Sequence, residues 1–370
     1  MLKCVAERLS ERFGEEATVA RMGGDEFAIF WANRSEHDPA AIGAEVCRQI
    51  ELLMVIEHRP LRVFACCGLV TSDCGRWASA DLISQADLAL YAAKATGKGR
   101  FVLFSEPMLR KQQRMAAIER ALVKGRTDDE VRVVFQPILD LDSGGVVAFE
   151  ALARWTNEEL GPVDPGEFIP AAEQMNVIGR LTDKTLDLAL RDAMHWPQHL
   201  RLSFNVSALQ LCELGAAQRL LAKLNAARFD PKRFQVEVTE TALLADFQVA
   251  RENMDILRAA GAVTALDDFG AGHASISYLR EMSFDVVKLD GSLVTHLATS
   301  DQSKKLLRGV IELCRSLGVR CVAEHVETSE QLNILRELGC HFVQGYLTRR
   351  PDTAAEIGKY LPVIDGRRAA

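Results

Sequence analysis

Polar side chains recur near the carboxyl ends of apolar, strand-like segments in the second half of the 370-residue chain. Strands that are buried on both faces of a parallel sheet are normally apolar throughout. The polar residues at these positions are Glu150, Asn205, Glu237, Asp267, Asp268, Lys288, Glu324 and Gln344. In a closed barrel of parallel strands these ends converge on one face, where catalytic groups are found. We therefore expect most of these side chains to meet in one cleft.

The acidic members of this set predict a two-metal site. Five or more carboxylates in a partly buried cleft repel one another unless protons or cations offset their charge, and Lys288 supplies one positive charge. All the donors are oxygen atoms, which Mg²⁺ and Mn²⁺ prefer and zinc does not. Because Asp267 and Asp268 are consecutive, one carboxylate could bridge two ions about 3.5 to 4 Å apart while its neighbour binds the second ion. We expect a water shared by the ions to attack a phosphodiester, with Lys288 holding that water or balancing the developing charge.

Each residue taken alone also has an ordinary structural interpretation. A single Asp or Glu at a strand end is more often a helix N-cap or a solvated carboxylate, so Glu327 and Glu240 alone are uninformative. Asn205 alone favours capping of the following helix. Lys288 alone could form a salt bridge at the rim, and Gln344 before a glycine could be a turn residue. The recurrence on successive strands is what favours the metal site.

The segments that must position these residues alternate regularly. From residue 131 onward, eight apolar or β-branched runs alternate with amphipathic helical stretches, which predicts an α/β fold with a closed, mostly parallel barrel inside its helices. The predicted strands are 133–139, 146–154, 201–206, 234–239, 263–267, 285–289, 319–323 and 341–344.

The first 105 residues form a separate predicted domain. Helical and strand patterns alternate there, and the glycines at 23 and 24 between two apolar runs predict a β-hairpin. A charged helix at 107–124 and a polar run at 125–130 follow, so we place a linker helix at 106–130 and the barrel domain at 131–370.

Composition excludes several classes of protein. The chain has 44 Lys and Arg against 51 Asp and Glu, a formal charge of −7, so no overall positive field attracts DNA. A polyanionic ligand must therefore be met locally, by metal ions or by placed arginines. No apolar run approaches the ~18 residues of a membrane span, and no secretory signal is evident, which predicts a cytoplasmic protein. The nine cysteines show no metal-binding spacing and are interpreted as reduced, apolar residues.

Seven segments together resemble the EAL family of cyclic-di-GMP phosphodiesterases. They lie at 149–155, 205–207, 237–240, 267–270, 287–290, 323–328 and 344–346. The resemblance covers about residues 110–355 and implies a modified TIM (β/α)8 barrel whose first strand runs antiparallel. It also implies hydrolysis of cyclic di-GMP to linear pGpG with Mg²⁺ or Mn²⁺, in the bacterial second-messenger signalling that is linked to biofilm formation and motility.

Residue roles follow from the resemblance position by position. The implied metal ligands are Glu150, Asn205, Glu237, Asp267, Asp268 and Glu324. The implied catalytic residues are Glu324 as well, Lys288 to position water, Glu327 and Gln344 to support the water network, and Glu240 to steady the loop after Asp268. The implied substrate-binding residues are Arg154, which matches a phosphate-contacting arginine, Gln136 and Leu152.

Three positions depart from the family pattern. Ala271 and His273 stand where Thr and an aromatic residue are usual, and His325 stands where glycine is common. The loop that contains Ala271 couples metal binding to dimerisation in relatives, and the alanine removes a hydroxyl that could fix it. We interpret these changes as tuning of the activity, and we expect a homodimer.

The first domain resembles a truncated GGDEF diguanylate cyclase domain, at residues 21–27 and 86–94. The family's first strand, with its metal-binding Asp and its guanine-reading residues, has no counterpart here, which leaves Asp25 as a lone ligand and predicts an inactive cyclase. Gly14 and Ala17 replace the family's inhibitory site, so product feedback is not expected. An upstream sensory module outside this chain is a further expectation.

Two alternatives to the phosphodiesterase remain at this point. The chain could be a non-catalytic cyclic-di-GMP receptor or scaffold that passes a signal to a partner, and the loop around Ala271 favours this reading. It could also be a bifunctional cyclase and phosphodiesterase, which the incomplete first domain disfavours.

Overall fold

The computed structural model describes residues 1–31, 38–56, 59–72, 79–125, 127–239, 246–271 and 276–364. The chain divides into two compact units, Met1–Ala116 and Ala117–Ala370. The division falls inside the helix α4 (Glu106–Lys124), which covers most of the predicted linker. Two of the residues singled out from the sequence, Glu240 and His273, lie outside the described residues.

The first unit has short sheets covered by helices. Its elements are α1 (Leu2–Phe13), β1 (Thr18–Gly23), β2 (Glu26–Phe30), α2 (Pro39–Glu51), β3 (Met54–Ile56), β4 (Arg59–Leu61), β5 (Cys67–Leu69), α3 (Ser79–Thr96) and β6 (Phe101–Leu103). The predicted hairpin is confirmed, because β1 and β2 pair antiparallel around the two glycines. At its turn the guanidinium of Arg21 donates to the carbonyl oxygen of Gly24 at 2.6 Å. A small apolar core that includes Leu9, Phe13 and Val46 packs α1 against α2.

The second unit contains the barrel. Its strands are β7 (Val131–Asp140), β8 (Val146–Asn157), β9 (Gly161–Val163), β10 (Arg201–Asn205), β11 (Phe234–Thr239), β12 (Val263–Phe269), β13 (Val286–Leu289), β14 (Arg320–Ala323) and β15 (Phe342–Val343). Hydrogen-bonded neighbours run from β10 through β15 to β7 and β8, and β8 pairs again with β10, which closes a ring of eight strands. The predicted barrel is therefore confirmed, and β9 is an extra strand on the edge of β8.

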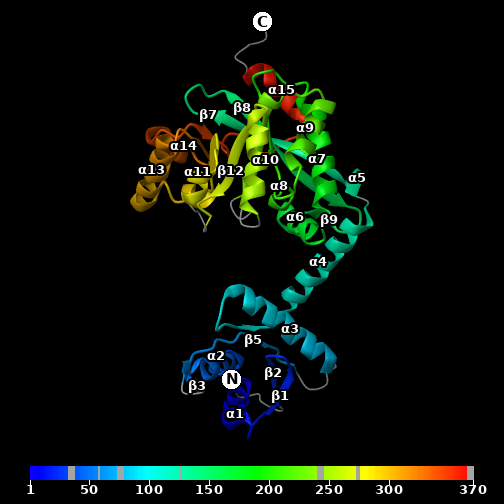
Figure 1. Cartoon of the computed structure of the whole chain (residues 1–370), viewed down its shortest axis with the longest axis vertical. Coiled ribbons are helices and arrows are strands. Elements are labelled where there is room, and N and C mark those ends of the chain that lie inside the picture. The colour runs from blue at the N-terminus through cyan, green and yellow to red at the C-terminus, as the bar shows by residue number, and fades with distance from the viewer. Residues whose placement is uncertain are drawn as a thin grey trace. The chain divides into compact units, whose positions relative to one another are not determined.

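The helices of the second unit follow the strands along the chain. They are α5 (Thr127–Glu130), α6 (Pro165–Gln174), α7 (Ile178–Ala193), α8 (Ala208–Leu211), α9 (Ala216–Ala226), the 3-10 turn η1 (Pro231–Arg233), α10 (Phe247–Ala259), α11 (Ile276–Glu281), α12 (Gly291–Val294), α13 (Asp301–Ser316), α14 (Ser329–Leu338) and α15 (Ala354–Ile364). Figure 1 shows α7, α10, α13 and α14 outside the strands of this unit. No helix in the described part of the chain combines the length and apolar character needed to cross a membrane.

The first barrel strand runs against the others. β7 pairs antiparallel with both β8 and β15, whereas the remaining pairs of the ring are parallel. The cause lies in the short connection between β7 and β8, since a parallel pair needs a crossover of a dozen or more residues. Asp140 fixes this turn, because its carboxylate accepts the backbone N–H groups of Asp142 at 3.1 Å and Ser143 at 2.8 Å.

Apolar residues close one end of the barrel interior and fill the layer under the helices. The interior cluster consists of Ile138, Ala148, Ala265, Val286, Val322 and Phe342. A larger core packs the outer faces of the strands against the helices. In this core the rings of Phe135 and Trp196 meet edge to face, with their centroids 5.0 Å apart. Because side chains alternate along a strand, the interior positions two residues further on are the polar ones.

Candidate active site

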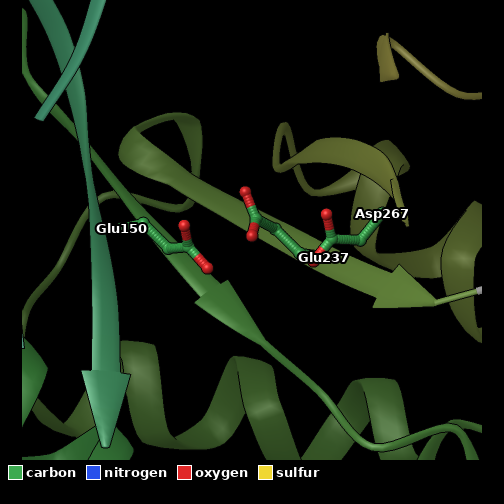
Figure 2. Close-up of side chains that lie close together, drawn as sticks. All are labelled: Glu150, Glu237 and Asp267. Atoms are coloured by element: carbon green, nitrogen blue, oxygen red, sulfur yellow. The ribbon is translucent and has the colours of Figure 1, made fainter. Parts of the chain in front are cut away.

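Three strands of the barrel place carboxylates in its interior. Glu150 comes from β8, Glu237 from β11 and Asp267 from β12, and Figure 2 shows their side chains directed toward a common space. The register explains the convergence, since Ser203 of β10 pairs with Glu150 and Asn205 of β10 pairs with Glu237. All three residues are buried, with Glu237 at 0% exposure.

Lys288 of β13 lies at the centre of the acidic side chains. Its Nζ is 2.8 Å from Glu237 Oε2, 2.8 Å from Glu324 Oε1, 3.1 Å from Asp267 Oδ1 and 3.3 Å from Glu150 Oε2. Its side chain is 1% exposed, so the rim salt bridge considered for Lys288 is wrong. One ammonium group therefore faces four buried carboxylates.

Four acids of the cluster retain protons more strongly than ordinary carboxylates do: Glu237, Asp267, Asp268 and Glu324. Burial raises the pKa of Glu237 to about 8, Glu150 and Asp267 add to the rise, and Lys288 opposes it. Burial also raises the pKa of Asp267 and Asp268, and raises that of Glu324 well above its ordinary value.

In Glu150 and Lys288, neighbouring charges and hydrogen bonds outweigh burial and shift the pKa so that the charged form is favoured. Burial alone would raise the pKa of Glu150, but Lys288 and hydrogen bonds from Gln344 and Asn205 lower it. Burial alone would lower the pKa of Lys288, yet the carboxylates of Asp267, Glu150 and Glu237 raise it well above the usual value. The cluster thus holds more negative charge than one lysine offsets, and protons or cations must supply the difference.

Two overlapping groups of oxygen donors fit divalent cations. Glu150, Glu237 and Asp267 each offer one oxygen within 4.8 Å of the others, and so do Asp267, Asp268 and Glu324. Asp267 belongs to both groups. The donors are hard oxygen atoms in a region of surplus negative charge, which suits Mg²⁺ or Mn²⁺.

Backbone strain marks the second group. Asp268 has φ 57° and His325, next to Glu324, has φ 54°, a left-handed conformation that costs an ordinary residue energy. The N–H of Asp268 donates to Asp267 Oδ1 at 3.0 Å. The ring of His325 lies against Gly291, where an added Cβ would come within 2.7 Å of it.

Amide side chains hold Glu150 from two sides. The side-chain NH₂ of Asn205 donates to Glu150 Oε1 at 2.6 Å, and that of Gln344 donates to Glu150 Oε2 at 2.6 Å. Gln344 also donates to Gln136 Oε1 at 3.2 Å. Gln344 Oε1 is buried and finds no hydrogen-bond partner within the described residues. The cap and turn interpretations of Asn205 and Gln344 are therefore wrong.

The segment after Asn205 is held by a hydrogen bond from Ser207. Ser207, at the N-cap of α8, makes no side-chain cap hydrogen bond; its hydroxyl donates to Glu173 Oε1 at 2.6 Å. This bond ties the end of β10 to α6. Close packing after Gln344 requires glycine at 345, since a Cβ there would lie 2.2 Å from the carbonyl oxygen of Val326.

Some residues singled out from the sequence lie away from the cluster. The side chain of Glu327 is exposed, and its backbone N–H donates to Gln331 at 2.8 Å. Leu152 and Arg154 lie further along β8 and are half-buried. The guanidinium of Arg154 donates to the carbonyl oxygen of Ala153 at 2.8 Å.

Two functional neighbours were missed by the sequence reasoning. Ser203 donates its hydroxyl to Glu237 Oε1, and the amide of Gln235 donates to the same oxygen at 3.0 Å and to Ser203 at 2.7 Å. Both side chains are buried. The alternation of side chains along a strand could have indicated both residues, because each stands two positions before a site residue that faces the interior.

Comparison with known families agrees with this geometry. The family model described as "EAL domain" matches residues 115–351, more than half of the chain. The chain belongs to the EAL domain family. A second model, "Diguanylate cyclase, GGDEF domain", matches residues 1–100 of this EAL protein.

Curated relatives resemble nearly the whole EAL chain. The cyclic di-GMP phosphodiesterase NbdA of Pseudomonas aeruginosa is 31% identical over 365 residues, which cover 98% of this chain and 47% of NbdA. The bifunctional diguanylate cyclase/cyclic di-GMP phosphodiesterase MucR of the same organism is 28% identical over 357 residues, which cover 95% of this chain and 52% of MucR. The chain thus spans about half the length of the curated relatives it matches.

Solved structures share the barrel. The phosphodiesterase domain of P. aeruginosa MucR in complex with c-di-GMP matches with a TM-score of 0.60 and 29% identity, over 66% of this chain and 99% of that domain. The cAMP-bound EAL enzyme Bd1971 matches with a TM-score of 0.62 and 25% identity, over 69% of this chain and 72% of that one.

Proposed function

We propose that this EAL protein hydrolyses cyclic di-GMP to linear pGpG in a metal-dependent reaction. The observation that carries the proposal is the pair of oxygen-donor groups that share Asp267 beside Lys288. The names of NbdA and of the MucR complex supply the substrate, because both relatives act on or bind cyclic di-GMP.

Two groups of residues would hold the metal ions. Glu150, Glu237 and Asp267, with Asn205 beside Glu150, form the first set, and Asp267, Asp268 and Glu324 form the second. Bound Mg²⁺ or Mn²⁺ ions would activate water and stabilise charge that develops on a phosphoryl group.

The protein's own groups then have distinct tasks. Lys288 holds the carboxylates at fixed positions in the absence of cations, and its ammonium group is placed to orient water or to balance charge at phosphorus. Gln344 and Asn205 fix the two oxygens of Glu150 by hydrogen bonds. The apolar interior cluster lies on the strands two residues before several of these groups and shields them from water at that end.

Further assignments belong to the same proposal. Gln136, Leu152 and Arg154 contact the substrate, and Glu327, Glu240 and Gln344 support the water network and the neighbouring loop. The domains are a truncated, inactive GGDEF domain at 1–105, a linker at 106–130 and the phosphodiesterase domain at 131–370. Homodimerisation, an upstream sensory module and a cytoplasmic location stay predictions.

A non-catalytic receptor is the second candidate. One observation favours it: the ammonium group of Lys288 contacts four carboxylates directly and offsets part of their charge. A receptor would bind cyclic di-GMP equally well in chelator and in Mn²⁺.

The decisive assay follows cyclic di-GMP and pGpG by chromatography with the full chain and Mn²⁺. We expect turnover by the wild type and none by Glu150→Ala, which lacks one oxygen donor of the first group. Binding of cyclic di-GMP without any pGpG from the wild type would favour the receptor instead.

A further inference from the structure

The carboxyl end of β8 extends beyond the part of the strand that both neighbours in the ring cover. β10 pairs with residues 148–151 of β8, and the short strand β9 pairs with residues 155–157. In the described part of the chain, residues 152–154 therefore pair with β7 alone. Leu152 and Arg154, which the proposed function assigns to the substrate, lie in this segment. Its position depends on contacts from outside the ring.

The carboxylate of Glu130 holds the residues that follow this segment. Its Oε2 accepts the indole N–H of Trp155 at 2.9 Å and the side-chain NH₂ of Asn157 at 2.9 Å. Its Oε1 accepts the backbone N–H of Glu158 at 3.3 Å. Hydrogen bonds to a charged acceptor are stronger than those between neutral groups. One carboxylate thus fixes the end of β8 and the start of the next turn.

The donors to Glu130 are themselves fixed by packing. Trp155 is 1% exposed, and its ring meets that of Phe168 on α6 edge to face, with the centroids 5.6 Å apart. Asn157 Oδ1 accepts the backbone N–H groups of Glu159 and Leu160, both at 3.0 Å, and so closes the turn to β9. The position of the Glu130 carboxylate is therefore passed to both β8 and β9.

Glu130 also belongs to the end of the linker. It is the last residue of α5, between the helix α4 and the strand β7. α4 ends before Gly125, which has φ 74° and where an added Cβ would come within 2.9 Å of the guanidinium of Arg180 on α7. The end of the linker is thus packed against α7, and Glu130 connects it to the substrate-binding part of β8.

We propose that Glu130 is a positioning residue for substrate binding, which orients Leu152 and Arg154 by holding the end of β8. The inference rests on the proposed function and adds a residue outside the barrel ring. The guanidinium of Arg154 donates to the carbonyl oxygen of Ala153, so its place follows that of the strand. Glu150 lies where β8 pairs on both sides, and it depends less on Glu130. A displacement of α4 therefore changes substrate binding before it disturbs the acidic cluster.

The test compares a large and a small diester with the full chain and Mn²⁺. Cyclic di-GMP uses the acidic cluster and the end of β8, whereas bis(4-nitrophenyl) phosphate uses the cluster. In Glu130→Ala we expect KM for cyclic di-GMP to rise about tenfold with kcat little changed, because a binding group misplaced by ~1 Å can cost even more. The kcat/KM for the small diester and the affinity for Mn²⁺ should stay at their wild-type values.

Two further variants sharpen the comparison. Asp129→Ala is the matched control, since it removes the exposed acid beside Glu130 on α5 and should leave every value unchanged. Trp155→Phe keeps an aromatic ring against Phe168 but loses the donor to Glu130. Because the two residues act through one bond, the increase in KM in the double variant should be smaller than the product of the two single increases.

The outcomes separate this inference from the proposed function. A wild-type KM for cyclic di-GMP in Glu130→Ala would overturn the inference, and so would equal losses on both substrates, which would indicate general destabilisation. Independent effects of Glu130→Ala and Trp155→Phe would also contradict it. A wild type that binds cyclic di-GMP without cutting it contradicts the proposed function, and the Kd from equilibrium dialysis, in place of KM, then decides the role of Glu130.

Discussion

Lys288 Nζ lies 2.8 Å from Glu237 Oε2, and both side chains are essentially inaccessible to solvent. The same ammonium group also contacts Glu150, Asp267 and Glu324. In the absence of cations, this lysine limits the repulsion between the carboxylates.

Replacing Lys288 with methionine should therefore destabilise the metal-free protein by about 3–5 kcal/mol, since buried charges lose their partner. Added Mn²⁺ should recover part of this loss by offsetting the same carboxylates. Urea unfolding with chelator and with Mn²⁺ measures both effects. Lys223→Met, which removes exposed ion pairs to Asp183 and Asp187, is the control and should cost less than about 1 kcal/mol. Equal effects of the two substitutions would contradict this role of Lys288.

The raised pKa of Glu237, about 8 against an ordinary 4.5, predicts the pH dependence of the metal-free protein. Between these values the folded chain keeps a proton that the unfolded chain has released, so the free energy of unfolding falls as pH rises. Thermal unfolding in chelator should show Tm decreasing across this window.

The variant Glu237→Gln serves as the control, because it cannot titrate and should show a shallower decrease. Mn²⁺ should flatten the wild-type curve for the same reason. A metal-free wild type whose Tm follows pH in the same way as Glu237→Gln would show that this carboxyl group does not contribute.

The hydrogen bonds from Ser203 and Gln235 to Glu237 Oε1 leave the other oxygen of this carboxylate toward Lys288. Because partners of this kind orient a ligand, Ser203→Ala and Gln235→Met should each weaken Mn²⁺ binding by about 10- to 100-fold. Isothermal titration with Mn²⁺ measures the affinity. Gln198→Met, in the segment that precedes β10, should bind Mn²⁺ as the wild type does. Wild-type affinity in both interior variants would disprove this positioning role.

His325 has φ 54° beside Glu324. Glycine tolerates this conformation and a β-branched residue does not. His325→Gly should leave the free energy of unfolding within about 1 kcal/mol of the wild type, while His325→Val should lower it by about 1–2 kcal/mol. Denaturant unfolding of both variants tests this, with His296→Val as an exposed control. Valine and glycine of equal stability at 325 would mean that the backbone relaxes there.

The barrel could be predicted from the sequence because its strands are strongly apolar and regularly spaced. All eight predicted barrel strands are present, with ends shifted by a few residues. The strand β9 was missed, since its three residues, Gly161–Val163, carry no alternation of their own. The antiparallel direction of β7 was available in the sequence, because six residues between the strands at 133–139 and 146–154 are too few for a crossover.

The residues of the acidic cluster could be predicted from their positions at strand ends, but their hydrogen-bond partners could not. Asn205 looked like a helix cap because a helix follows it, and only the pairing of β10 with β8 shows that Glu150 is its neighbour. The left-handed backbone of Asp268 could not be predicted from the sequence, whereas that of His325 has a signal, because His325 stands where glycine is common in the family pattern. The contact between Glu130 and Trp155 required the register of two strands.

The most direct test of the account uses Asp267, which belongs to both groups of oxygen donors. Asp267→Asn keeps the shape of the side chain but removes its charge. We predict that the wild type binds two Mn²⁺ ions per chain by titration and forms pGpG, and that Asp267→Asn loses most of its Mn²⁺ binding and its turnover together. Rapid cleavage of cyclic di-GMP by the wild type in excess chelator, or by Asp267→Asn at the wild-type rate, would contradict the account.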